Sequence, residues 1–199
     1  MPASVVAPTK DEWRSRFRDY RRTLPPEQYR AKSTLICERA LALAPVAAAA
    51  VVHVYWPQPA RREVDTRPLI QALRGRGATV VLPVVTGYDP AAPTMEHRRY
   101  EGRDALSRNR WGIGEPTGTA RVAPDALDVV IVPALGADRS GTRLGYGAGY
   151  YDAFLRGLDV PRILLTYTGC LIPSLPAEAH DVPVTAVVTE RCVLATDGP

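Results

Sequence analysis

The sequence predicts a three-layer α/β/α fold, a single domain in which helices cover both faces of a mostly parallel sheet. Short apolar, β-branched segments recur along the chain without polar alternation, which is typical of strands buried on both faces. Between the first two of these segments, residues 65–74 have a helical pattern. A strand, a helix and a strand within about thirty residues form the right-handed unit from which parallel sheets are built. The length of 199 residues fits one domain.

Two helices are expected at the start of the folded part. In residues 10–24, apolar side chains recur every three or four positions and arginines occupy a neighbouring arc. A proline pair ends this helix, and a second helical pattern over residues 27–43 ends at Pro45. Residues 1–9 show no secretory signal pattern and are expected to form a flexible tail, with residues 10–199 as the single domain.

Five buried strands should follow. They are expected at residues 50–55, 79–85, 129–132, 162–167 and 185–188. Asp65 or Thr66 is positioned to cap the intervening helix, and glycines lie near its end. Residues 86–124 are rich in turn formers, so we expect a long loop there, or an antiparallel excursion around residues 95–101.

The composition limits the class of protein. With 46% hydrophobic and 23% charged residues the chain can build a core, and no apolar run is long enough to cross a membrane. Cys37, Cys170 and Cys192 are odd in number and lack metal-ligand spacing, which favours a cytoplasmic location over a disulfide framework or a structural zinc site. The formal net charge of +4 is carried by dispersed arginines, which favours recognition of phosphate or carboxylate groups over coating of nucleic acid.

The densest functional pattern lies in residues 128–155, where a buried strand leads into a glycine-rich loop and then a helix that begins near Gly149. Glycines let consecutive backbone N–H groups turn toward one anion, and Arg143 offers a planar fork for phosphate oxygens. Asp152 is placed to hold a metal ion. The spacing matches neither a P-loop nor a dinucleotide fingerprint, so these rules leave the ligand open. Alternatively, the glycines only form a tight turn and Asp152 is a first-turn helix acid.

This segment closely resembles the signature of the 5-formyltetrahydrofolate cyclo-ligase family. The resemblance rests on the run RLGYGAGYYD at residues 143–152 and extends over nearly the whole chain. Further matching segments are residues 10–14, Tyr55 with 63–66, 82–84, 112–116, 175–176, 180–181 and 188–190. The resemblance implies an ATP- and magnesium-dependent enzyme that converts 5-formyltetrahydrofolate to 5,10-methenyltetrahydrofolate, releases ADP and phosphate, and passes through a phosphorylated formyl (imidate) intermediate.

The same resemblance assigns a first group of residues to ATP. Lys10 and Arg14, one helical turn apart, match the family's N-terminal nucleotide contact. The triphosphate cradle comprises Arg143, Leu144, Gly145, Tyr146, Gly147, Ala148, Gly149, Tyr150 and Tyr151. Arg143 and Tyr151 are expected to act in catalysis. Replacing Arg143 with alanine is expected to reduce turnover far more than stability, because a loop arginine is not part of the core.

The resemblance assigns the remaining candidate site residues to magnesium and to folate. Asp152 and Asp181 match the carboxylates that family members offer to magnesium. Glu63 matches the acid that accepts paired N–H bonds from the pterin, and Gln58 matches a further substrate contact. The residues expected to border or stack on the folate are Tyr146, Tyr150, Tyr55, Met95, Tyr100 and Trp111.

Four departures from the family pattern leave the acceptor open. They are Ala137, His97, Ala148 and the stretch 167–170. One alternative is therefore an ATP-dependent paralogue with another acceptor, and a second is a non-catalytic nucleotide or phosphate sensor. Nucleic-acid binding through arginines around Tyr100 is disfavoured, because such clusters are usually solvated faces. We expect a monomer with a small-molecule folate substrate and neither nucleic-acid nor membrane partners.

Overall fold

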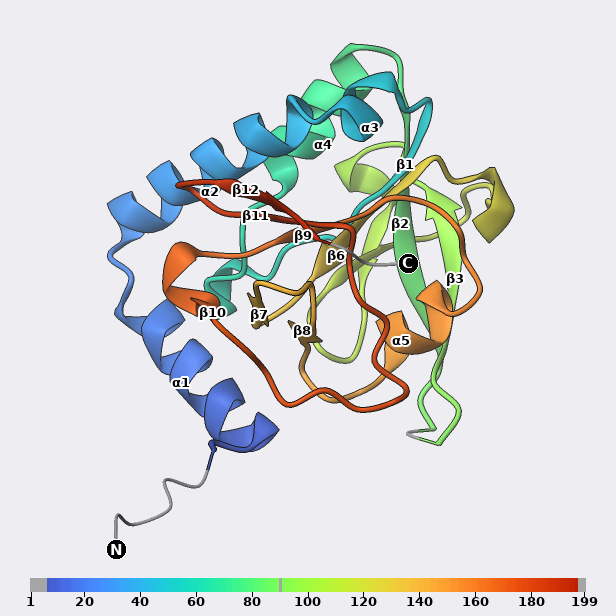
Figure 1. The fold of residues 1–199 in the computed structure, drawn as a ribbon. Helices are drawn as coiled ribbons and strands as arrows, with labels where there is room; N and C mark the ends of the chain where they lie inside the picture. The colour runs from blue at the N-terminus through green and yellow to red at the C-terminus, as the bar shows by residue number, and fades with distance from the viewer. Residues whose placement is uncertain (1–6, 90, 197–199) are drawn as a thin grey trace, which may run out of the picture.

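The computed structural model describes residues 7–89 and 91–196, and its centre is a seven-stranded sheet (Figure 1). The strands lie in the order β12-β11-β9-β6-β1-β2-β3. The five inner strands pair in parallel, and the edge strands β12 and β3 are antiparallel to their neighbours. Their bounds are β1 (Val51–His53), β2 (Thr79–Gly87), β3 (Thr94–Arg99), β6 (Val129–Pro133), β9 (Arg162–Leu165), β11 (Ala186–Val188) and β12 (Val193–Ala195).

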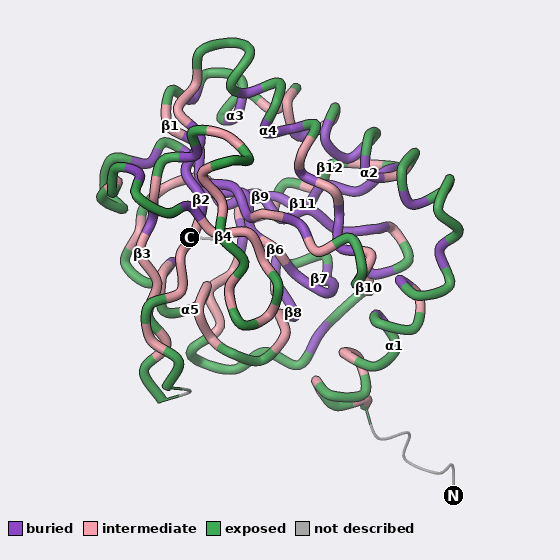
Figure 2. The backbone as a smooth tube through the Cα atoms, turned by 180° about the vertical axis from the view of Figure 1, so that it is seen from behind, coloured by how far each residue is buried: buried purple, intermediate pink, exposed green. Residues whose placement is uncertain are grey.

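Helices pack on both faces of this sheet, as the sequence predicts. Side chains alternate between the faces of a strand. In β6, Val129 and Ile131 join the core beneath α1 (Lys10–Thr23), α2 (Pro26–Leu41) and α4 (Arg67–Gly75). Val130 and Val132 join the second core, which Leu155 of α5 (Tyr150–Leu155) also enters. Purple, buried backbone accordingly runs through the middle strands in Figure 2. The three-layer arrangement is confirmed.

The ends of several elements differ from the expectation. The first strand ends at His53 rather than residue 55, and α2 ends at Leu41. Pro45 does not close that helix but lies in the first turn of a further short helix, α3 (Ala44–Ala48), where its missing N–H is tolerated. Thr9 is the N-cap of α1, with its hydroxyl and the Glu12 carboxylate forming a capping box. Residues 1–6 of the expected tail lie outside the described residues.

The segment 86–124 contains the antiparallel excursion that the sequence allowed. Strand β3 runs back along β2, as expected around residues 95–101. A hairpin of β4 (Leu106–Arg108) and β5 (Gly114–Pro116) follows and was not predicted. No described helix is long and apolar enough to cross a membrane.

A second, three-stranded sheet supports the glycine-rich loop. It consists of β7 (Gly136–Asp138), β8 (Arg143–Leu144) and β10 (Leu171–Ile172). Asp138 is buried, and its carboxylate accepts hydrogen bonds from the N–H groups of Ser140, Thr142 and Leu175. One carboxylate therefore holds the β7–β8 turn and the 175 segment together, and the loop leaves the sheet at a fixed position.

Candidate active site

One cavity of about 890 Å³ lies past the carboxyl ends of the central strands. That edge is where ligands bind in open parallel sheets. The lining includes all residues predicted for ATP, folate and magnesium except Tyr100. Tyr100 is buried and packs on Trp56 with a ring-centroid distance of 5.5 Å, so it does not form part of the cavity wall.

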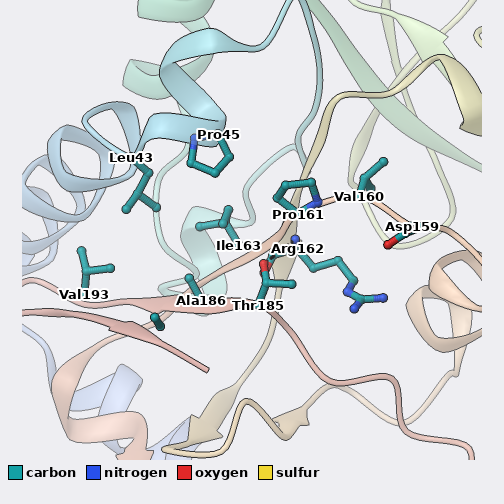
Figure 3. Close-up of a pocket in the computed structure, with 11 residues that line it drawn as sticks. Leu43, Pro45, Asp159, Val160, Pro161, Arg162, Ile163, Thr185, Ala186 and Val193 are labelled. Carbon is teal, nitrogen blue, oxygen red and sulfur yellow. Dashed lines mark hydrogen bonds between the residues drawn. The ribbon is translucent and has the colours of Figure 1, made fainter. Parts of the chain in front are cut away.

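A second cavity of about 450 Å³ lies at the amino-terminal edge of the same sheet (Figure 3). Leu43 and Pro45 from the α2–α3 junction and Val193 from β12 surround Ile163 there. This lining is mostly apolar, and it lies away from the strand ends at which open α/β sheets bind ligands. The large cavity is therefore the candidate site.

The glycine-rich loop joins β8 to α5 along one side of the cavity. Gly147 has φ +97° and Gly149, the N-cap of α5, has φ +73°, a left-handed conformation that favours glycine. Arg14 of α1 reaches this loop, and its Nε donates a hydrogen bond of 3.1 Å to the Gly145 carbonyl oxygen. Helix α5 has only six residues, so its dipole contributes little to anion binding at the loop.

Lys10 and Asp181, predicted for ATP and magnesium respectively, form an ion pair. The Lys10 Nζ lies 2.7 Å from Asp181 Oδ2 and 3.1 Å from Glu178 Oε1. Burial alone would raise the pKa of Asp181, but the hydrogen bonds from Lys10 and the Glu178 amide lower it below its ordinary value. This carboxylate therefore stays ionised at the cavity mouth.

Arg143 and Asp152 form the second ion pair of the site, and Arg143 is only 6% exposed. The Val182 amide donates a 3.2 Å hydrogen bond to Asp152, so the segments that carry Asp152 and Asp181 touch, as their assignment to one site requires. Arg143 lies in β8 and is buried, so the reason given for expecting its removal to reduce turnover far more than stability, that a loop arginine is not part of the core, is wrong. Across residues 7–89 and 91–196, no group of three or more His, Cys, Asp or Glu side chains is arranged to hold a metal.

Glu63 is a second acidic group in the cavity lining, apart from Asp152 and Asp181. It is 4% exposed, and its Oε2 accepts a 3.0 Å hydrogen bond from the backbone N–H of Gln58. Burial raises the pKa of Glu63, while Arg21, the Gln58 amide and Arg61 act in the opposite direction. The Arg61 guanidinium lies 5.3 Å from the centre of the Tyr146 ring, which also lines the cavity.

Aromatic rings also line the cavity. The ring centroids of Trp111 and Tyr150 are 6.1 Å apart in an edge-on arrangement, and the Tyr150 hydroxyl donates to the Gly87 carbonyl oxygen at 3.0 Å. Met95 lines the same cavity. The Tyr55 hydroxyl donates to the Val64 carbonyl oxygen, so only part of that residue borders the cavity.

Tyr151 lines the cavity, but its hydroxyl is buried. No described group hydrogen-bonds to that hydroxyl, and the ring lies 5.9 Å from His53 and 6.1 Å from Phe154. Burial raises the pKa of Tyr151 well above its usual value. The hydroxyl therefore remains protonated and is a hydrogen-bond donor rather than a base.

Two of the departures from the family pattern lie away from the cavity. His97 is buried against Phe154 at a ring-centroid distance of 4.1 Å, and Ala137 is fully buried in β7. Neither side chain lines the cavity, so neither alters its wall by direct contact. Within the stretch 167–170, Tyr167 and Cys170 are buried, and they do not line it either.

Sequence reasoning missed Arg21 and Glu178, and it did not foresee that Asp138 holds the β7–β8 turn. Arg21 looked like one of the solvated arginines of the first helix, although it follows the apolar Phe17 by one helical turn. Because residues one helical turn apart lie on the same face, this spacing places Arg21 on the apolar face of the helix, and that was the feature of the sequence that indicated its burial. Glu178 had no such sign, because only the tertiary fold brings it to Lys10.

Comparison with known proteins identifies a family for the chain. A model of the "5-formyltetrahydrofolate cyclo-ligase family" matches residues 6–190. The 5-formyltetrahydrofolate cyclo-ligase of Escherichia coli K12 is 34% identical over 178 residues, covering 87% of this chain and 96% of that protein. The enzyme of the same name from Mycolicibacterium smegmatis is 34% identical over 139 residues, covering 67% of this chain and 71% of that protein.

Solved structures give the same result. The NMR structure of Aquifex aeolicus 5,10-methenyltetrahydrofolate synthetase superimposes with a TM-score of 0.83 at 29% identity, covering 96% of this chain and 94% of that one. A 5,10-methenyltetrahydrofolate synthetase from Mycoplasma pneumoniae, at 20% identity and a TM-score of 0.73, shares the fold over 91% of this chain and 98% of that one. The chain therefore belongs to the 5-formyltetrahydrofolate cyclo-ligase family.

Proposed function

We propose that this protein converts 5-formyltetrahydrofolate to 5,10-methenyltetrahydrofolate in an ATP- and magnesium-dependent reaction that releases ADP and phosphate. The observation that carries the proposal is the shared cavity. The buried carboxylate of Glu63 and the cation-lined glycine loop border one volume of about 890 Å³. Phosphoryl transfer depends mainly on positioning and electrostatic stabilisation, and one cavity for both reactants supplies the first of these.

Glu63 binds the pterin in this proposal. An ionised carboxylate accepts paired N–H bonds from the aminopyrimidinone edge, and the Gln58 amide orients that carboxylate. Trp111 and Tyr146 offer ring faces on which the substrate can pack.

The triphosphate lies on the glycine loop, within reach of Lys10, Arg14 and Arg143. Lys10 and Arg143 are paired with carboxylates, and they exchange these partners for phosphate oxygens when the nucleotide enters. Asp152 and Asp181 are then free to act as hard oxygen ligands, the donor type that magnesium prefers. Bound magnesium would neutralise phosphate charge in this site.

The formyl oxygen then attacks the terminal phosphorus of ATP, and ADP leaves. This step gives the phosphorylated formyl intermediate. N10 then attacks the activated carbon and loses its proton to solvent, and phosphate departs. The guanidinium of Arg143 stabilises the negative charge on the transferring group. The Tyr151 hydroxyl stays protonated, so in this proposal it can act only as a hydrogen-bond donor and not as a base.

The proposal extends to the remaining expectations. We propose a cytoplasmic monomer that does not bind nucleic acid. The three cysteines are unpaired, and Cys37 and Cys170 are buried, which supports a reducing location. Sedimentation at several protein concentrations tests the monomer, and a concentration-dependent increase in mass would contradict it.

An absorbance assay tests the reaction itself. Purified protein with 5-formyltetrahydrofolate is expected to form the ultraviolet band of the methenyl product only when Mg-ATP is present, with ADP released in equal amount. Absence of the product at saturating ATP, or ADP release with folate-free acceptors only, would reject the proposal and favour another acceptor.

A further inference from the structure

Asn109 organises the hairpin tip, the name we give to residues 109–113 between β4 and β5. Its Oδ1 accepts hydrogen bonds from the backbone N–H groups of Trp111 and Ile113, at 2.9 and 3.0 Å. Its carbonyl oxygen accepts the Gly112 N–H at 2.9 Å, and its own N–H is donated to the Ile113 carbonyl oxygen. Three successive N–H groups of the hairpin tip therefore converge on one residue, which closes the turn.

The same side chain links the hairpin tip to the central sheet through Glu115. Asn109 Nδ2 donates a 2.8 Å hydrogen bond to Glu115 Oε1, and this oxygen also accepts the Val85 N–H of β2 at 3.1 Å. Strand β1 ends opposite Val81, so it offers Val85 no acceptor. A two-stranded hairpin has little stability of its own. The position of the hairpin tip therefore depends on the link from Asn109 through Glu115 to β2.

Trp111 is the aromatic residue that the hairpin tip contributes to the cavity. Its ring centroid lies 5.3 Å from that of Tyr88 and 6.1 Å from that of Tyr150. The Arg110 guanidinium lies over both Tyr88 and Trp111, at 4.4 and 4.7 Å from the ring centres. Trp111 lines the cavity, whereas Asn109 does not. Any effect of Asn109 on a ligand must therefore pass through its neighbours.

We propose that Asn109 is a positioning residue for the folate: its bond to Glu115 holds the hairpin tip at β2 and so keeps the Trp111 ring at the cavity wall. The inference rests on the proposed function, because it takes Trp111 to pack on the substrate. Closing the turn requires only the Oδ1 acceptor of Asn109. Positioning Trp111 also requires the Nδ2 donor, and this difference separates the two roles.

Nucleotide binding should depend much less on this link. The hairpin tip carries none of the residues assigned to the triphosphate. Tyr150 contacts Trp111, but its own hydroxyl is bonded to the Gly87 carbonyl oxygen and does not need the hairpin tip for its position. A displaced hairpin tip should therefore weaken folate binding selectively.

The experiment begins with Asn109→Ser. A serine hydroxyl closes similar turns and adds no charge, but it lacks the amide donor and is too short to reach Glu115. Calorimetry measures the dissociation constants of 5-formyltetrahydrofolate and Mg-ATP. We expect folate binding to weaken about tenfold, equivalent to about 1.4 kcal/mol, and Mg-ATP binding to change less than about twofold. Ser107→Ala, at an exposed position of β4, is the control and should change neither.

A double-mutant cycle tests whether Asn109 acts through Glu115. Glu115 lines the cavity, so Glu115→Ala alone is expected to weaken folate binding at least as much as Asn109→Ser. In the Glu115→Ala background the bond is already lost, and Asn109→Ser should then cause no further loss of folate affinity. The cycle therefore isolates the link from any separate contact of Glu115 with the substrate.

Fluorine NMR gives a readout that does not require folate. The chain has three tryptophans, so protein labelled with 5-fluorotryptophan should give three signals, and Trp111→Phe identifies that of Trp111. In Asn109→Ser without ligand, the Trp111 signal should shift, while the signal of Trp13 on α1 should not. A loss of stability alone would not shift one signal of the folded protein selectively.

The results that would overturn the inference are specific. They are wild-type folate affinity in Asn109→Ser, an equal loss of folate and Mg-ATP affinity, or a loss that persists in the Glu115→Ala background. If Asn109→Ser does not fold, an unmoved Trp111 signal in Glu115→Ala overturns the inference. A wild-type protein that binds no folate overturns the proposed function instead, and the Trp111 signal then still tests the link.

Discussion

Arg143 combines a structural role with its proposed role in the reaction. Its guanidinium is buried and pairs with Asp152, which also accepts the Val182 amide. Breaking a partly buried pair leaves a carboxylate without its counter-charge, and that carboxylate is costly to keep buried. A substitution at this position is therefore expected to affect both folding and the proposed phosphate binding.

Arg143→Ala is expected to lower the free energy of unfolding by about 2–4 kcal/mol and to reduce kcat at least about a hundredfold, because both contacts are lost. Arg143→Lys should recover part of the stability but little of the rate, since an ammonium lacks the planar fork. Urea unfolding and steady-state kinetics measure the two effects. Arg139→Ala, an exposed neighbour, is the control and should change neither. An Arg143→Ala protein of wild-type stability would contradict this reading of the pair.

His53 and His97 form a buried pair beneath α5. Their ring centroids are 5.1 Å apart, and both rings contact Phe154. Neither nitrogen of His53 has a hydrogen-bond partner among the described groups. Burial lowers the pKa of His97 to about 4, with Glu96 acting against it, and lowers the pKa of His53 well below its usual value. Both rings are therefore neutral in the folded protein.

The free energy of unfolding should fall as the pH drops from about 6.5 to about 4, because the unfolded chain binds protons there that the folded chain does not. The His97 contribution is about 3 kcal/mol at 1.36 kcal/mol per pKa unit. His97→Phe keeps a ring against Phe154 and removes this titration, so its stability should depend less steeply on pH. Urea unfolding at pH values across this window measures the slope. If the free energy of unfolding depends equally steeply on pH in the two proteins, the pKa of His97 is not lowered in the folded state.

At the scale of elements, α1 links the sheet to the site. It carries Lys10, Arg14 and Arg21, which reach the 181 segment, the glycine loop and the chain after β6 respectively. Phe17 of the same helix packs beside Gly136 of β7. The placement of the cations therefore depends on how closely α1 approaches β7.

Gly136→Ala tests this close approach. An added Cβ would overlap the Phe17 ring and lie 2.5 Å from the Cys170 carbonyl oxygen, so α1 must move away. We expect a loss of about 1–3 kcal/mol in stability and weaker Mg-ATP binding. The matched control is Gly75→Ala at the end of α4, where no described atom lies within 4 Å of the added Cβ, and it should leave ATP binding unchanged. Thermal unfolding measures the stability, and calorimetry measures Mg-ATP binding. Unchanged ATP binding in Gly136→Ala would show that the positions of the α1 cations do not depend on how closely α1 approaches β7.

The elements that could be predicted from the sequence are those in which apolar residues recur at a regular spacing or form a continuous run. The spacing from Trp13 to Leu24 identifies α1, and continuous apolar runs identify β1, β2, β6 and β9. Strands such as β8 and β12 have two or three residues, too few to show a pattern, and their pairing is set by tertiary contacts. The glycine loop was recognised from its residues. The partners of its cations were not, because Asp181 lies 171 residues from Lys10.

At the scale of the molecule, we propose that residues 10–199 fold as one cooperative domain. Both cores contain residues of the same central sheet, so neither layer can separate without exposing the other. Urea unfolding followed by far-UV circular dichroism and by tryptophan fluorescence should give coincident transitions. Two separate transitions would indicate independent units.

Ligand binding gives a second prediction for the whole molecule. Mg-ATP at one hundred times its dissociation constant should raise the free energy of unfolding by about 2.7 kcal/mol.

The ion pair between Lys10 and Asp181 also bears on biosynthesis. The first helix leaves the ribosome long before its partners, since its contacts with the glycine loop and with Asp181 span 131 and 171 residues. At about 5–20 residues per second, the nascent chain waits on the order of ten seconds or more for these partners. In the proposed arrangement, nucleotide therefore cannot assist the early steps of folding, because an interrupted translation product lacks part of the proposed binding site.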